Sequence, residues 1–158
     1  MKKVFLLVKK DLYSEMRNAH SISSIILYVF ATVYIIYSAF INIQPQNWNV
    51  LFWIVFLFVS VNALLRSFDQ ENSNKALYFY QLAGPLQIFA AKFIFNTILL
   101  VLLGLLTLAL FSFVAGSPVR DYPLFLLTIL LAGIGFASIF SFISAIGAKT
   151  GNSHMLTA

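Results

Sequence analysis

The sequence has no cysteine, and only 9% of its 158 residues are charged. The lack of cysteine excludes disulfide bonds, zinc sites with cysteine ligands, thiol catalysis and covalent haem attachment through a C-x-x-C-H motif. A soluble domain carries about 25% charged residues, so this chain could not cover a water-facing surface with polar groups. With 61% hydrophobic residues and a mean hydropathy of +0.91, the composition indicates a membrane protein.

Long uncharged stretches indicate where the chain crosses the membrane. They cover residues 18–65, 93–119 and 122–148, counting histidine as neutral. A helix needs about 20 mostly apolar residues to cross a bilayer, and in lipid a helix satisfies all its own backbone groups. The first stretch is long enough for two crossings. We therefore predict an all-α integral membrane protein, a single membrane domain over residues 1–158, with spans at about 22–41, 50–65, 93–115 and 124–146.

The segment 42–49, with the sequence NIQPQNWN, separates the first two spans. Pro45 and the surrounding Asn and Gln residues predict a turn over the whole segment. Trp48 is expected at the membrane–water interface, where tryptophan side chains concentrate.

The basic residues predict the orientation of the chain. Nine of the ten Lys and Arg residues precede the first span, lie in the 66–92 loop or follow the last span, and only Arg120 lies on the other side. Since short cytoplasmic segments carry the excess of Lys and Arg, the N-terminus is expected in the cytoplasm. The loops 42–49 and 116–123 would then face outward.

The first 20 residues are expected to form an amphipathic helix on the cytoplasmic face. Phe5, Val8, Leu12 and Met16 recur at helical spacing, while lysines and Arg17 supply a polar side. Such a helix lies in the membrane interface. The alternative is a flexible basic leader.

The cytoplasmic loop 66–92 is the candidate coupling segment. Ser73 or Asn74 can cap a short helix over 76–82 that ends at Gly84-Pro85, and Pro85 can open the next helix. Aromatic side chains on such a helix would suit a docking surface for a soluble partner, or alternatively an aromatic belt at the lipid headgroups. The residues predicted to contact such a partner are Asp69, Glu71, Lys75, Leu77, Tyr78, Phe79 and Tyr80.

The last predicted span contains small residues four apart, and Gly104 occurs in the span before it. Small residues let helices approach closely in a membrane. We expect packing within one bundle, with a dimer interface as the alternative, and Asn62 and Asn96 as helix-to-helix hydrogen bonds. The small residues are Gly133, Ala137, Ser141 and Ala145.

No cofactor, metal or catalytic site is predicted in this chain. The segment 143–150, ISAIGAKT, lacks both glycines of a phosphate-binding loop, so nucleotide would bind elsewhere. The predicted spans contain no acidic or basic residue of the kind that ion-coupled carriers use. His20 and His154 lie at cytoplasmic span ends, where an interfacial histidine is expected rather than a haem or metal ligand.

A series of short motifs recurs along nearly the whole chain in a recognisable order and spacing. The motifs are Ser67-Phe68, Gln70-Glu71, Leu77-Tyr78-Phe79-Tyr80, Gly84-Pro85, Lys92, Asn96, Gly116-Ser117-Pro118-Val119, Gly133-Ile134-Gly135-Phe136, Ala148-Lys149 and Asn152-Ser153. In these motifs the sequence resembles the CcmB family, also called haem exporter protein B. The three consecutive aromatic residues at 78–80 resemble the version found in Bacteroidetes-type bacteria.

This resemblance implies the permease subunit of the ABC transporter of cytochrome c maturation, in the bacterial inner membrane. It implies a separate ATPase subunit (CcmA-like), further membrane subunits (CcmC-like and CcmD-like), a permease homodimer, and haem as a species that the complex handles. The family's permease has six spans, so we expect this chain to be truncated at its C-terminus. The alternative function is a stand-alone four-span membrane assembly factor without an ATPase partner.

Overall fold

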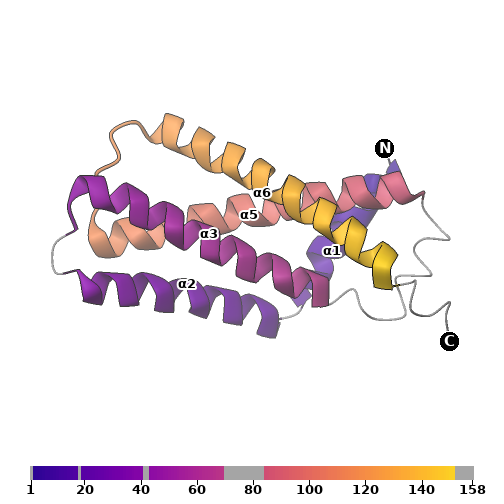
Figure 1. Ribbon diagram of the computed structural model, residues 1–158, viewed down its shortest axis with the longest axis horizontal. Helices are drawn as coiled ribbons and strands as arrows, with labels where there is room; N and C mark the ends of the chain where they lie inside the picture. The colour runs from indigo at the N-terminus through magenta and orange to yellow at the C-terminus, as the bar shows by residue number, and fades with distance from the viewer. Residues whose placement is uncertain (1, 18, 41–42, 70–83, 152–158) are drawn as a thin grey trace.

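The computed structural model describes residues 2–17, 19–40, 43–69 and 84–151, and all regular structure in these residues is α-helical (Figure 1). The all-α fold class predicted from the sequence is therefore confirmed. The helices are α1 (Lys2–Arg17), α2 (Ala19–Ala39), α3 (Pro45–Asp69), α5 (Pro85–Ala115) and α6 (Tyr122–Gly151).

Three of these helices contain segments long and apolar enough to cross a membrane. The segments are Pro45–Ala63 in α3, Leu86–Ala115 in α5 and Tyr122–Ile143 in α6. The apolar part of α2, Ser23–Ala39, is shorter. However, α2 has 21 residues in all, which at about 1.5 Å per residue is roughly the thickness of the bilayer core. A fourth crossing by α2 stays a prediction.

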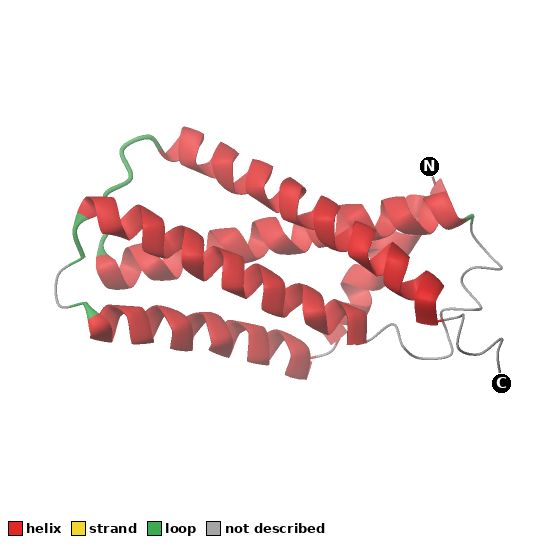
Figure 2. Cartoon of the chain, in the orientation of Figure 1, coloured by secondary structure: helices red, strands yellow, loops and turns green. Residues whose placement is uncertain are grey.

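The four apolar helices run up and down beside one another, with α1 across one end (Figures 1 and 2). The connections from α2 to α3 and from α5 to α6 lie together at the end that we call the hairpin end. The end of α3 and the start of α5 lie at the opposite end, which we call the α1 end because α1 crosses the bundle obliquely there. The helix α5 is central, since it packs against each of the other four.

Two prolines begin helices, and one of them corrects a predicted boundary. The turn predicted for residues 42–49 is wrong after Gln44, because α3 already begins at Pro45. Proline suits the first helical position, because an N–H group there would have no acceptor within the helix and because the φ angle of proline is already helical. The backbone N–H of Trp48 donates to the carbonyl of Gln44 at 2.9 Å, which closes the first turn. Pro85 opens α5, as predicted.

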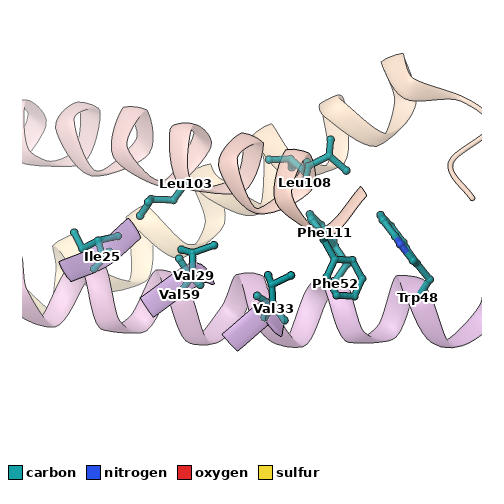
Figure 3. Packing of buried hydrophobic residues seen from close by; sticks show 12 residues of the cluster. Ile25, Val29, Val33, Trp48, Phe52, Val59, Leu103, Leu108 and Phe111 are labelled. Atoms are coloured by element: carbon teal, nitrogen blue, oxygen red, sulfur yellow. The ribbon is translucent and has the colours of Figure 1, made fainter. Parts of the chain in front are cut away.

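A column of aromatic rings on α3 lies in the core near the hairpin end, where Figure 3 shows Trp48 and Phe52 close to Phe111 of α5. On α3 the rings of Trp48, Phe52 and Phe56 stack with interplanar angles of 2°. Phe111 of α5 and Phe125 of α6 pack against this column, with ring centroids 5.1 Å from Trp48 and 5.0 Å from Phe52. Aromatic pairs add about 0.5–1.5 kcal/mol each beyond the area they bury. The column therefore joins three helices into one packed unit.

The side chain of Trp48 packs inside the bundle. It is only 1% exposed, so it belongs to the core. Its placement at the membrane–water interface stays a prediction. The position along the chain is still that of a helix end. A sequence pattern can place a tryptophan at the end of a span, but cannot show whether neighbouring helices cover it.

The helix α1 packs against α5 and α2, and the side it presents to them differs in part from the predicted stripe. Val8 is buried and Leu12 half-buried, as expected for a packed side. Phe5, in contrast, is 70% exposed and points away from the bundle. Val4 and Leu7 are half-buried in its place, so the packed side is rotated relative to the predicted one.

Candidate functional site

The predicted coupling segment joins two helices of the core. Of its predicted contact residues, Asp69 is the last residue of α3. The other six, at positions 71, 75 and 77–80, and the short helix predicted over 76–82, lie outside the described residues. The described residues continue from Gly84, whose carbonyl accepts hydrogen bonds from the N–H groups of residues 87 and 88 in the first turn of α5. The segment therefore begins and ends on α3 and α5, at the α1 end.

An electrostatic attraction acts between α1 and α5 at the α1 end. Asp11 of α1 and Lys92 of α5 lie near enough to attract each other, and the side chain of Lys92 is half-buried. Lys10 also forms an ion pair with Asp11, with 3.1 Å between Nζ and Oδ1. No role was predicted for Asp11 from the sequence. Its position beside Val8 and Leu12 on the helical wheel was the signal that it would face the protein.

Three of the four small residues predicted for helix packing lie buried on α6, the helix that packs most extensively on α5 (Figure 1). A Cβ atom at Gly133 would lie 3.1 Å from Cγ2 of Val101 on α5, so the two backbones approach closely there. Ala137 and Ser141 follow on the same side of α6 and are 0% and 2% exposed. The side chain of Ala145 lies outside the described residues.

A polar contact lies within this apolar helix pair. The amide Nδ2 of Asn96 on α5 donates to Oγ of Ser141 on α6, with a separation of 3.2 Å. The helix-to-helix hydrogen bond predicted for Asn96 is confirmed. Its Oδ1 is also buried and has no hydrogen-bond partner in the described part of the chain. A buried hydrogen bond of this kind fixes the rotation and register of two helices that are otherwise held by non-directional packing.

At the hairpin end, a side chain of one helix holds the loop between two others. The indole Nε1 of Trp48 donates to the carbonyl of Gly116 at 2.8 Å. Gly116 ends α5 with φ at 72°, a conformation that a residue with a side chain rarely adopts. A hollow of about 450 Å³ lies beside this contact, between the starts of α3 and α6, and its lining includes Trp53, Phe125 and Arg120.

The described residues offer little for catalysis or cofactor binding. In them, no three His, Asp or Glu side chains come together in a way that could hold a metal ion. The side chains of His20 and His154 lie outside the described part of the chain. The described arrangement is a long central helix, α5, that packs against α3 and α6 and is joined to both by hydrogen bonds, with α1 at one end.

Comparison with known proteins identifies the family. A family model described as CcmB protein matches residues 2–156. No curated protein and no solved structure matches the chain. The family match covers nearly the entire sequence, and the apolar helical bundle agrees with a multi-pass membrane protein. The chain belongs to the CcmB family, the non-catalytic permease subunits of the ABC transporter of cytochrome c maturation.

Proposed function

We propose that this chain passes the movement of a separate ATPase subunit into the membrane during cytochrome c maturation. The observation that carries the proposal is the CcmB family match over residues 2–156. The fold supports it, because the described helices form a packed apolar bundle whose polar connecting segments lie at its ends. In this role the chain binds no resident cofactor, and haem is a species handled by the complex.

The segment from Asp69 to Leu82 is the proposed docking site for the ATPase. It is joined directly to α3 and α5, so a partner that holds it pulls on both helices. The helix α5 packs against each of the other helices and reaches the hairpin end without a break. A displacement at the α1 end would therefore move the contact between Trp48 and Gly116 at the opposite end.

This mechanism requires the α1 end to face the cytoplasm, where ATP is available. The distribution of basic residues supports that orientation, because nine of ten Lys and Arg residues fall on the side of α1. We place the chain in the bacterial inner membrane with its N-terminus in the cytoplasm. A second permease copy and CcmC-like and CcmD-like membrane subunits complete the proposed complex.

The docking role of this segment is tested by removing two of its aromatic side chains and measuring whether the ATPase still binds. Truncating a buried aromatic anchor commonly costs about 2 kcal/mol or more, which is roughly a thirtyfold loss of affinity. Tyr78→Ala combined with Tyr80→Ala should therefore prevent recovery of the CcmA-like ATPase when the tagged chain is purified from membranes. The chain itself should still insert, because neither residue lies in a predicted span.

A matched control removes two tyrosines elsewhere. Tyr34 and Tyr37 on α2 are 68% and 46% exposed and belong to an apolar helix, so Tyr34→Ala with Tyr37→Ala should leave ATPase recovery unchanged. Equal recovery with the docking-segment variant and the unmodified chain would contradict the docking role. Absence of any ATPase from the unmodified complex would favour the stand-alone assembly factor instead.

A further inference from the structure

The helix α1 divides its charges between two sides. It is not among the segments apolar enough to cross a membrane. The side that packs toward α5 and α2 is apolar, but it also carries both acidic residues of the helix. The half-buried or buried residues on this inner side are Val4, Leu7, Val8, Asp11, Leu12 and Glu15.

The outer side of α1 carries exposed cations interleaved with large apolar side chains. Phe5, Leu6 and Tyr13 are 70%, 62% and 69% exposed. The cations whose side chains are described, at positions 9, 10 and 17, are exposed as well. A water-facing helix surface would not gain from three large exposed apolar groups, whereas a membrane surface takes up apolar groups and cations together.

Part of this outer side forms a shallow, open hollow. The hollow, of about 460 Å³, is lined by Lys10, Tyr13, Ser14 and Arg17. Two cations and two hydroxyl groups therefore lie along it, all able to donate hydrogen bonds to an anionic oxygen. Lys10 also pairs with Asp11, but half of its side chain remains exposed, at 49%. A phosphate group matches this set of donors in charge and in chemistry.

We propose that the outer side of α1 binds anionic phospholipid headgroups, with a lipid phosphate in the hollow and Phe5, Leu6 and Tyr13 inserted beneath the headgroups. Continuity with the membrane supports a lipid over an acidic protein. The apolar helix α2 starts only two residues after α1 ends, so α1 is held where a membrane surface begins. This role is independent of ATPase docking, since it uses a different part of the chain.

The absence of cysteine makes a single-probe experiment available. Leu6→Cys places a fluorescent label on the outer side of α1 without touching the lining of the hollow, and acrylamide, a neutral quencher, reports the exposure of the label to water. The labelled chain is placed in nanodiscs of phosphatidylcholine alone or with phosphatidylglycerol added in steps. We expect phosphatidylglycerol to reduce quenching by acrylamide, and high salt to restore it, because salt screens surface charges.

Neutral variants measure the contribution of the cations. Each Lys or Arg near an anionic surface contributes about 1 kcal/mol, so Arg17→Gln should raise the amount of phosphatidylglycerol needed for half-protection about fivefold. Combining Lys9→Gln, Lys10→Gln and Arg17→Gln should abolish protection. Arg120→Gln is the matched control, because it removes a cation at the hairpin end and should change nothing.

Three results would overturn the proposal. The first is acrylamide quenching that does not respond to phosphatidylglycerol in the labelled chain without further substitutions. The second is protection by the purified ATPase in phosphatidylcholine nanodiscs without an effect of phosphatidylglycerol, which would assign the outer side of α1 to the protein partner. The third is protection that survives high salt and the triple substitution, which would exclude the headgroup contact.

Discussion

Three glycines in the helical bundle provide a graded test of how closely its helices pack. Gly104 on α5 is the tightest position, because a Cβ there would lie 2.6 Å from Cγ2 of Ile129 and 2.9 Å from the ring of Phe56. Gly133 is intermediate, with 3.1 Å to its nearest neighbour. At Gly135 a Cβ would meet nothing within 4 Å. The same change, glycine to alanine, can therefore be made where α5 meets α3 and α6 and also on an open helix surface.

Comparing these variants isolates the contribution of helix packing to the free energy of unfolding. All three substitutions gain the same helix propensity, about 1 kcal/mol for alanine over glycine. Carbon atoms pack best at about 3.5–4.0 Å, so at Gly104 the neighbouring side chains must move by roughly 1 Å. Overpacking of this size costs about 1–3 kcal/mol. Gly104→Ala should thus be less stable than Gly135→Ala by about 1–3 kcal/mol, with Gly133→Ala between them.

Unfolding in mixed micelles, with increasing sodium dodecyl sulfate, measures these stabilities. Trp48 and Trp53 are the two tryptophans of the chain, and both lie 6.0 Å from the ring of Phe125 on α6. Their fluorescence therefore reports separation of α3 from α6. If Gly104→Ala and Gly135→Ala unfold at the same detergent fraction, then α5 does not approach α3 and α6 as closely as described.

Two further predictions concern the ends of the bundle. Trp48→Phe keeps an aromatic ring but loses the hydrogen bond to Gly116, so it should lower the free energy of unfolding by about 1 kcal/mol; Trp53→Phe is the control, and equal effects would contradict a role for that bond. The proposed orientation predicts that a cysteine replacing Ser117 reacts with an impermeant thiol reagent in intact spheroplasts, whereas one replacing Ser73 does not; labelling at position 73 would reverse the orientation.

The sequence alone determined the fold class and much of the helix layout. In an uncharged stretch of more than 20 residues that crosses lipid, the backbone N–H and C=O groups can find hydrogen-bond partners only within the backbone itself. Helices are therefore predicted from composition before any packing is known. Pro85 marked the start of α5 because proline fits a first helical turn. Pro45 follows the same rule, but its Asn and Gln neighbours favoured a turn, and the helix begins earlier than predicted.

Only the tertiary structure decided which sides of the helices meet. In an apolar span nearly every side chain is hydrophobic, so no alternation distinguishes a side that faces lipid from one that faces protein. The hydrogen bond from Trp48 to the carbonyl of Gly116 joins residues far apart in the chain. The attraction between Asp11 and Lys92 likewise acts between residues far apart in the chain. The rotation of α1 that leaves Phe5 exposed arises in the same way. Such contacts depend on how α5 packs against its four neighbours, which is a property of the assembled bundle and not of any one segment.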